Sequence, residues 1–108
     1  MSNKWYSTSL LFEGVNSGKP ETEYLWEESI VLFFAKDEEE AIKKANLYGI
    51  NSETEYESVS KDIVKWKFRH ILGIQEVLSD KISDGTEVFS RHLRASEVTS
   101  LRTPFDGE

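Results

Sequence analysis

Residues 24–49, YLWEESIVLFFAKDEEEAIKKANLYG, contain a predicted strand that passes directly into a predicted amphipathic helix. The strand, residues 23–35, ends in the longest apolar run of the chain, residues 30–35. A strand that is apolar on both faces needs a cover on each of them. We expect a helix on one face, and either the C-terminal segment or a second subunit on the other.

The helix, residues 37–49, carries its own start and end signals. Asp37 followed by Glu40 forms a capping-box pattern, and the acidic residues 38–40 lie in the first turn, where the helix dipole favours negative charge. The helix dipole alone accounts for these three acidic residues, so no metal site is needed to explain them. Gly49 is placed to end the helix. The predicted inward stripe follows helical spacing: Ala41, Ile42, Ala45 and Tyr48.

Other parts of the chain show the two-residue alternation that is typical of strands. We predict these further strands at residues 5–14, 55–59, 63–78 and 87–94. Gly73 inside the long run indicates a bulge or bend, and Ser96 can start one helical turn. In the strand at residues 5–14, the predicted core face consists of Tyr6, Thr8, Leu10 and Phe12. In the strand at residues 63–78, it consists of Val64, Trp66, Phe68, His70, Leu72 and Ile74.

These elements predict one α+β domain over residues 1–108, with an ordered part of about 4–98. The sheet is expected to be mainly antiparallel, in the order β-β-α-β-β-β, with the one main helix packed on one face. The absence of cysteine excludes disulfides, thiolate metal sites and cysteine nucleophiles. No signal peptide or membrane-spanning run is present, so a cytoplasmic location is expected.

The charge distribution bears on possible partners. The net charge of −7 argues against nucleic-acid binding, which relies on neutralising phosphates. The basic stripe Lys65, Lys67 and Arg69 can be a phosphate-binding groove or a solvated sheet face that pairs with Glu55 and Glu57. We favour the solvated face, because the neighbouring aromatic side chains alternate to the other side of the strand.

Two adjacent carboxylates, Glu27 and Glu28, are the first candidates for chemistry. Neighbouring side chains on a strand point to opposite faces, so this pair cannot act together on one substrate atom. Glu28 shares its face with Trp26. We expect it either to pair with a cation such as Arg69, Arg91 or a histidine, or to have a raised pKa.

The second candidate is a pair of histidines, His70 and His92, each next to an arginine. If their strands are neighbours, both imidazoles can gather near Glu28 and form a two-histidine, one-carboxylate metal site. Because no metal-binding spacing supports this, we predict no metal and no cofactor, and we read His70 as a core histidine. The candidate binding set is Trp26, Glu28, His70, Arg91 and His92, and no catalytic residue is predicted.

Several segments together resemble a known family: WYSTSLLFE at residues 5–13, LWEES at 25–29, WKF at 66–68 and DGTEVFSR at 84–91. The chain resembles a bacterial domain-of-unknown-function family, number 4288, over about residues 5–94. The resemblance implies a small bacterial single-domain protein. It implies no activity and no site residues, since none is established for the family.

The leading functional hypothesis is a non-enzymatic protein-interaction module that forms a homodimer or binds another protein. It rests on the second apolar face of residues 30–35, which needs a cover. The alternative is a small-molecule site or enzyme built from the candidate binding set. A further alternative is a toxin-neutralising, immunity-type protein, because an acidic domain can mask a basic surface. Neither a nucleic acid nor a membrane is expected as a partner.

Overall fold

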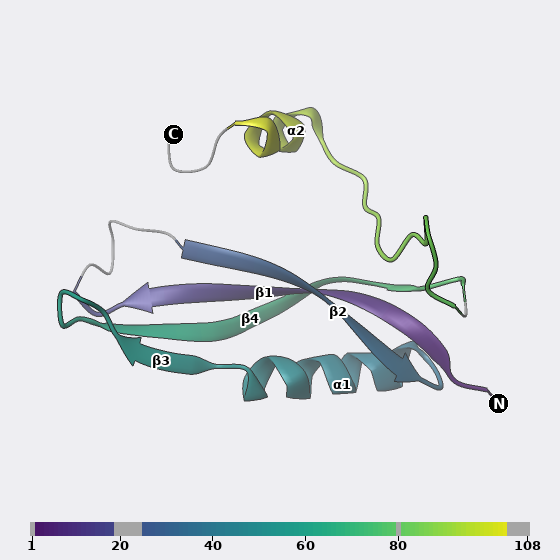
Figure 1. The fold of residues 1–108 in the computed structure, drawn as a ribbon, viewed down its shortest axis with the longest axis horizontal. Helices are drawn as coiled ribbons and strands as arrows, with labels where there is room; N and C mark the ends of the chain where they lie inside the picture. The colour runs from purple at the N-terminus through teal and green to yellow at the C-terminus, as the bar shows by residue number, and fades with distance from the viewer. Residues whose placement is uncertain (1, 19–24, 80, 104–108) are drawn as a thin grey trace.

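The computed structural model describes residues 2–18, 25–79 and 81–103. The elements are, in order, β1 (Lys4–Asn16), β2 (Leu25–Ala35), α1 (Glu38–Asn51), β3 (Thr54–Glu57), β4 (Ile63–Glu76) and α2 (Ala95–Arg102). All strand pairs are antiparallel, and the sheet order is β2-β1-β4-β3 (Figure 1). The predicted α+β class and antiparallel sheet are confirmed. The predicted start of the second strand, residues 23 and 24, lies outside the described part.

The predicted fifth strand at residues 87–94 is wrong. This segment has no strand pairing and runs over the sheet on the side opposite α1 (Figure 1). Its contacts come from side chains: Gln75 Nε2 donates to the Ser90 carbonyl oxygen at 3.1 Å, and Phe89 lies over Gly73. The physical reason is that the segment lies over the face of the sheet opposite α1, where it contacts β4 through the side chains of Phe89 and Gln75, rather than in the plane of the sheet, where backbone pairing takes place.

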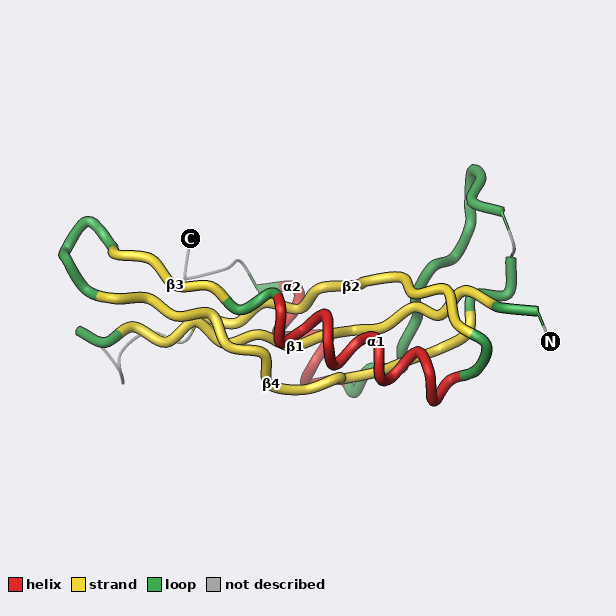
Figure 2. Tube along the Cα trace, turned by 90° about the horizontal axis from the view of Figure 1, so that it is seen from below, coloured by secondary structure: helices red, strands yellow, loops and turns green. Residues whose placement is uncertain are grey.

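The helix α1 packs along the sheet beneath β1, β2 and β4 (Figure 2). Asp37 is its N-cap and accepts a hydrogen bond from the Glu40 backbone N–H at 2.8 Å. The Glu40 carboxylate accepts from the Lys36 N–H at 2.7 Å, so the predicted capping box forms with its second bond displaced by one residue.

The prediction that Gly49 ends the helix is wrong, since α1 continues to Asn51 and Ser52 is its C-cap. Gly49 instead lies against the ring of Phe68 on β4. A Cβ atom at this position would lie 2.5 Å from Phe68 Cγ, so only glycine permits the close approach of helix and strand.

The core lies between α1 and the sheet. The face predicted for the first strand is confirmed, because Tyr6, Leu10 and Phe12 are buried there. They pack with Ala41 and Ala45 of the predicted helix stripe, whereas the other two members of the stripe, Ile42 and Tyr48, are partly exposed. We call this covered side of the sheet the inner face and the opposite side the outer face.

Strand β4 pairs with β1 through two register shifts, one between Gly73 and Ile71 and one between His70 and Phe68. The first confirms the irregularity predicted at Gly73. Each shift inserts one extra residue, which reverses the side on which later residues lie. His70 therefore pairs opposite Leu11 on the outer face, and the prediction that it continues the inner face of Trp66 is wrong.

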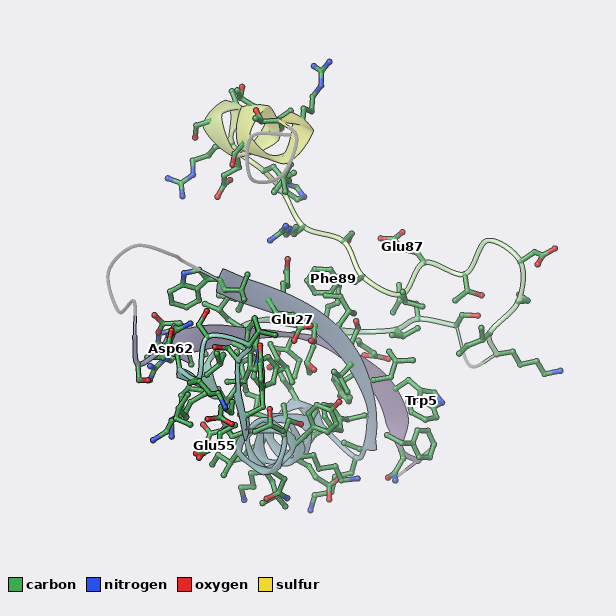
Figure 3. All side chains as sticks on the ribbon, turned by 60° about the vertical axis from the view of Figure 1, so that its left-hand side comes forward. Trp5, Glu27, Glu55, Asp62, Glu87 and Phe89 are labelled. Atoms are coloured by element: carbon green, nitrogen blue, oxygen red, sulfur yellow. The ribbon has the colours of Figure 1, made fainter. Side chains whose placement is uncertain are left out.

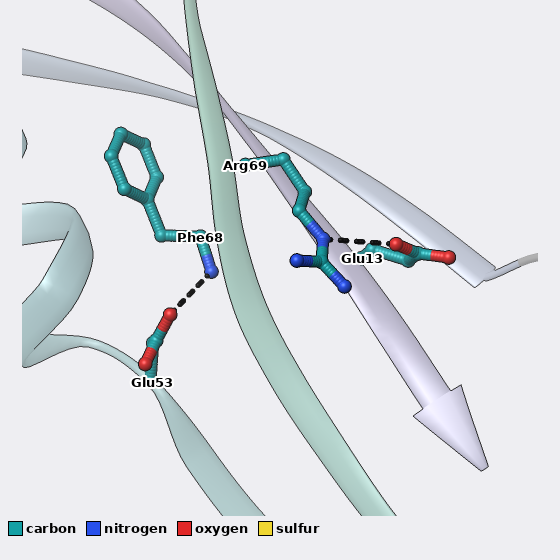
Figure 4. A network of polar contacts seen from close by, with 4 residues as sticks. All are labelled: Glu13, Glu53, Phe68 and Arg69. Atoms are coloured by element: carbon teal, nitrogen blue, oxygen red, sulfur yellow. Dashed lines mark hydrogen bonds and ion pairs between the residues drawn. The ribbon is translucent and has the colours of Figure 1, made fainter.

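Two carboxylates hold the strand at the second shift (Figure 4). Glu53, which directly precedes β3, accepts a hydrogen bond from the Phe68 backbone N–H at 2.9 Å. Glu13 of β1 accepts from Arg69 Nε at 2.9 Å. Backbone and side-chain donors that the irregular pairing leaves free are thus satisfied.

No helix in the described part of the chain is long and apolar enough to cross a membrane.

Candidate functional site

The outer face of β2 carries a row of partly exposed apolar side chains. Trp26, Ile30 and Phe34 recur at every fourth residue on this face and are 46%, 43% and 44% exposed, with Glu28 and Leu32 between them. We call these three residues the outer row. Trp5 of β1 extends the row, because its ring lies 4.8 Å from that of Phe34, centroid to centroid. The row lies on an edge strand, and each of its three side chains is partly exposed to solvent.

The other face of the same strand is covered. Val31, Phe33 and Ala35 pack against the core beneath α1. The sequence therefore correctly indicates that both faces of residues 30–35 are apolar. The structure covers one of these faces with a helix, whereas a large part of the outer row stays in contact with solvent.

Glu28 lies between Trp26 and Ile30 and forms the predicted ion pair with Arg91. Arg91 Nη1 lies 3.3 Å from Glu28 Oε2, and the buried Ser9 hydroxyl donates to the same oxygen at 2.5 Å. Both charged side chains keep partial contact with water. The cluster fixes the C-terminal segment to the sheet, and it neutralises the carboxylate that the sequence singled out.

The two histidines do not complete a site with Glu28. In the strand register, Leu11 lies opposite Glu28 on one side and opposite His70 on the other. Two strand spacings separate the backbones of Glu28 and His70 by about 10 Å. His92 follows Arg91 in the extended segment and is exposed. Across residues 2–18, 25–79 and 81–103, no group of three metal-ligating side chains can hold a metal ion.

A cleft that we did not predict from the sequence lies on the inner face, where α1 ends before the sheet does. Its volume is about 300 Å³. Its lining combines one carboxylate, hydroxyls and aromatic rings: Phe12, Glu27, Ser29, Tyr48, Ser52, Thr54 and Trp66. Figure 3 shows Glu27 on the α1 side of β2. The alternation of residues 25–35 separates it from Glu28, as predicted.

The indole of Trp66 is positioned in this cleft by a glycine. A Cβ atom at Gly14 would lie 3.2 Å from two ring carbons of Trp66, so the missing side chain makes room for the ring. The sequence signal for the cleft is the pair of polar residues Glu27 and Ser29 in the inner-face row of β2. Polar side chains in a row that is otherwise covered by a helix indicate a gap in that cover.

The fold and the outer row define the class of this protein: an α+β domain with an antiparallel sheet, one covering helix and an apolar edge strand. The chain belongs to the domain family described as "Domain of unknown function (DUF4288)", which it matches over residues 5–90. This confirms the family suggested by the sequence segments. Neither a curated protein nor a solved structure matched the chain.

Proposed function

We propose that this domain is a protein-interaction module that associates with a second copy through the outer row of β2. The observation that carries the proposal is the partial exposure of Trp26, Ile30 and Phe34 on the same face of an edge strand, where the only charged side chain between them, Glu28, is paired with Arg91. Contiguous exposed apolar side chains mark interaction sites, and tryptophan is enriched among residues that dominate binding energy.

The flanking charges support the same surface. Lys4 lies 3.8 Å from Glu76, and Glu28 is matched by Arg91. Acidic side chains near the row are thus neutralised within the chain. A surface that is apolar at its centre, with paired charges around it, has the composition of a protein interface.

Sedimentation of matched variants tests the proposal. Ile30→Lys places a charge in the outer row, whereas Ile50→Lys places the same charge on an exposed isoleucine of α1. We expect the wild type and Ile50→Lys to sediment as dimers at micromolar concentration, and Ile30→Lys to sediment at 12.5 kDa. A wild-type protein that stays at the monomer mass would contradict the proposal.

A second candidate function is the binding of a small organic cation in the inner-face cleft. A carboxylate beside aromatic rings attracts ammonium and guanidinium groups, and Glu27, Tyr48 and Trp66 supply this combination. Choline and methylguanidinium are suitable probes. Binding should shift the Trp66 indole resonance in the wild type and not in Glu27→Gln, and an equal shift in both proteins would exclude this site.

A further inference from the structure

The C-terminal arm, residues 81–103, ends in a helix that packs on no other helix or strand in the described part of the chain. No Cα atom of α2 lies within 8 Å of a Cα atom in another element of the described structure. Figures 1 and 3 show α2 standing away from the sheet on the outer-face side. None of its eight residues is buried.

A helix of this length requires a packing surface. Isolated helices shorter than about 12–15 residues are marginal in water, because too few hydrogen bonds offset the cost of nucleation. Val98 and Leu101 lie three residues apart on one side of α2 and are 39% and 62% exposed. An apolar pair at this spacing forms a stripe that can pack against a second apolar surface.

The base of the arm, in contrast, is fixed. Phe89 lies over Gly73, Ser90 accepts from the Gln75 side chain, and Arg91 pairs with Glu28. Beyond Arg91, the hydrogen bonds and ion pairs found in the described residues of the arm stay within the arm itself. The chain therefore anchors the arm beside the outer row and then leaves α2 free.

We propose that the dimer forms by reciprocal exchange of these arms, with α2 of each copy packed on the outer row of the other. This inference rests on the proposed function and names the segment that completes the interface. Each copy offers one free helix and one uncovered row. Two such contacts related by a two-fold axis use both surfaces of both copies and close the assembly.

The area of the outer row shows why a second segment is needed. Its three side chains leave on the order of 250 Å² exposed, given the usual surface of large apolar side chains. Stable interfaces bury about 800 Å² from each partner. Direct contact between two outer rows therefore falls well short, whereas docking of α2 adds both the helix and the surface that it covers.

Cysteine cross-linking tests the exchange directly, because the chain has no cysteine of its own. Ile30→Cys and Leu101→Cys are made in separate full-length chains, which are mixed and treated with a short bis-maleimide. A link between the two substituted positions must then join two chains. We expect this link between positions 30 and 101 to dominate in peptide mapping, and to disappear when Ile50→Cys replaces Ile30→Cys.

In addition, Leu101→Asp should weaken the dimer by about tenfold or more.

The other outcomes separate the two proposals. If the wild type is a dimer that Ile30→Lys disrupts, but only links between two copies of position 30 form, the interaction surface stands and arm exchange is overturned. If a chain with both cysteines links only within itself, α2 folds back on its own row and exchange is again overturned. A monomeric wild type overturns both proposals.

Discussion

At the scale of single residues, the contact between helix and sheet depends on a glycine. Gly49 lies in the last turn of α1 and faces the ring of Phe68, which also packs against Phe12 with a centroid distance of 5.6 Å. Glycine inside a helix costs about 1 kcal/mol relative to alanine. The close packing of Phe68 between α1 and β1 offsets this cost.

Gly49→Ala should therefore destabilise the domain, although the same substitution stabilises an ordinary exposed helix. The new methyl group would lie 2.5 Å from Phe68 Cγ, and overpacking of this kind costs about 1–3 kcal/mol. After the gain of about 1 kcal/mol in helix propensity, we expect a net loss of up to about 2 kcal/mol in the free energy of unfolding, measured with urea at fixed protein concentration. Asn46→Ala on the exposed side of α1 is the control and should be neutral or slightly stabilising. A Gly49→Ala protein that is more stable than the wild type would contradict the close contact between Gly49 and Phe68.

The sequence predicts some residues of the candidate site well and others poorly. The pairing of Glu28 with Arg91 is predictable, since a carboxylate among apolar neighbours needs a cation. The position of His70 is not, because strict alternation along β4 fails where the register shifts. Only one of the two shifts is marked by a glycine, so alternation alone cannot locate the other.

At the scale of elements, the segment 87–94 shows what alternation measures. Its pattern indicates an extended chain, and the chain is extended there, but a strand also needs backbone pairing at a sheet edge. This segment instead lies over a face of the sheet, whose edge strands are β2 and β3. Which strand lies at an edge depends on the order of the whole sheet, and local sequence does not contain that information.

The start of α2 makes a prediction about pH at this scale. The Glu97 carboxylate accepts a hydrogen bond from the Arg94 backbone N–H at 2.7 Å, and this bond lowers its pKa below the ordinary 4.5. The contribution of Glu97 to the helix is therefore complete above about pH 4.5 and is lost as the pH falls through the lowered value.

Nuclear magnetic resonance can follow this loss through the Arg94 amide. We expect its chemical shift to titrate with a midpoint below 4.5 in the wild type. In Glu97→Gln the amide oxygen still accepts the bond but does not titrate, so the shift should be independent of pH in this range. A wild-type midpoint at or above the ordinary value would show that the hydrogen bond is not formed.

At the scale of the whole molecule, the chain is more extended than a compact domain of its length. The radius of gyration is 16.7 Å, against about 13 Å for a compact chain of this size. The free arm accounts for part of this excess, and the long, narrow sheet accounts for the rest (Figure 2). Such a shape leaves apolar surface that a single copy does not cover.

If two copies supply that cover, thermal stability must depend on protein concentration. Dissociation accompanies unfolding of a dimer, so mass action raises Tm as concentration rises. A tenfold increase corresponds to about 1.4 kcal/mol, which for a dimer of this size shifts Tm by about 3–5 °C. Scanning calorimetry over a hundredfold range should show this shift in the wild type and in Ile50→Lys. Ile30→Lys should unfold at one temperature throughout, because a folded monomer has no partner to lose. If the wild-type Tm also stays constant over this concentration range, association through the outer row does not stabilise the fold.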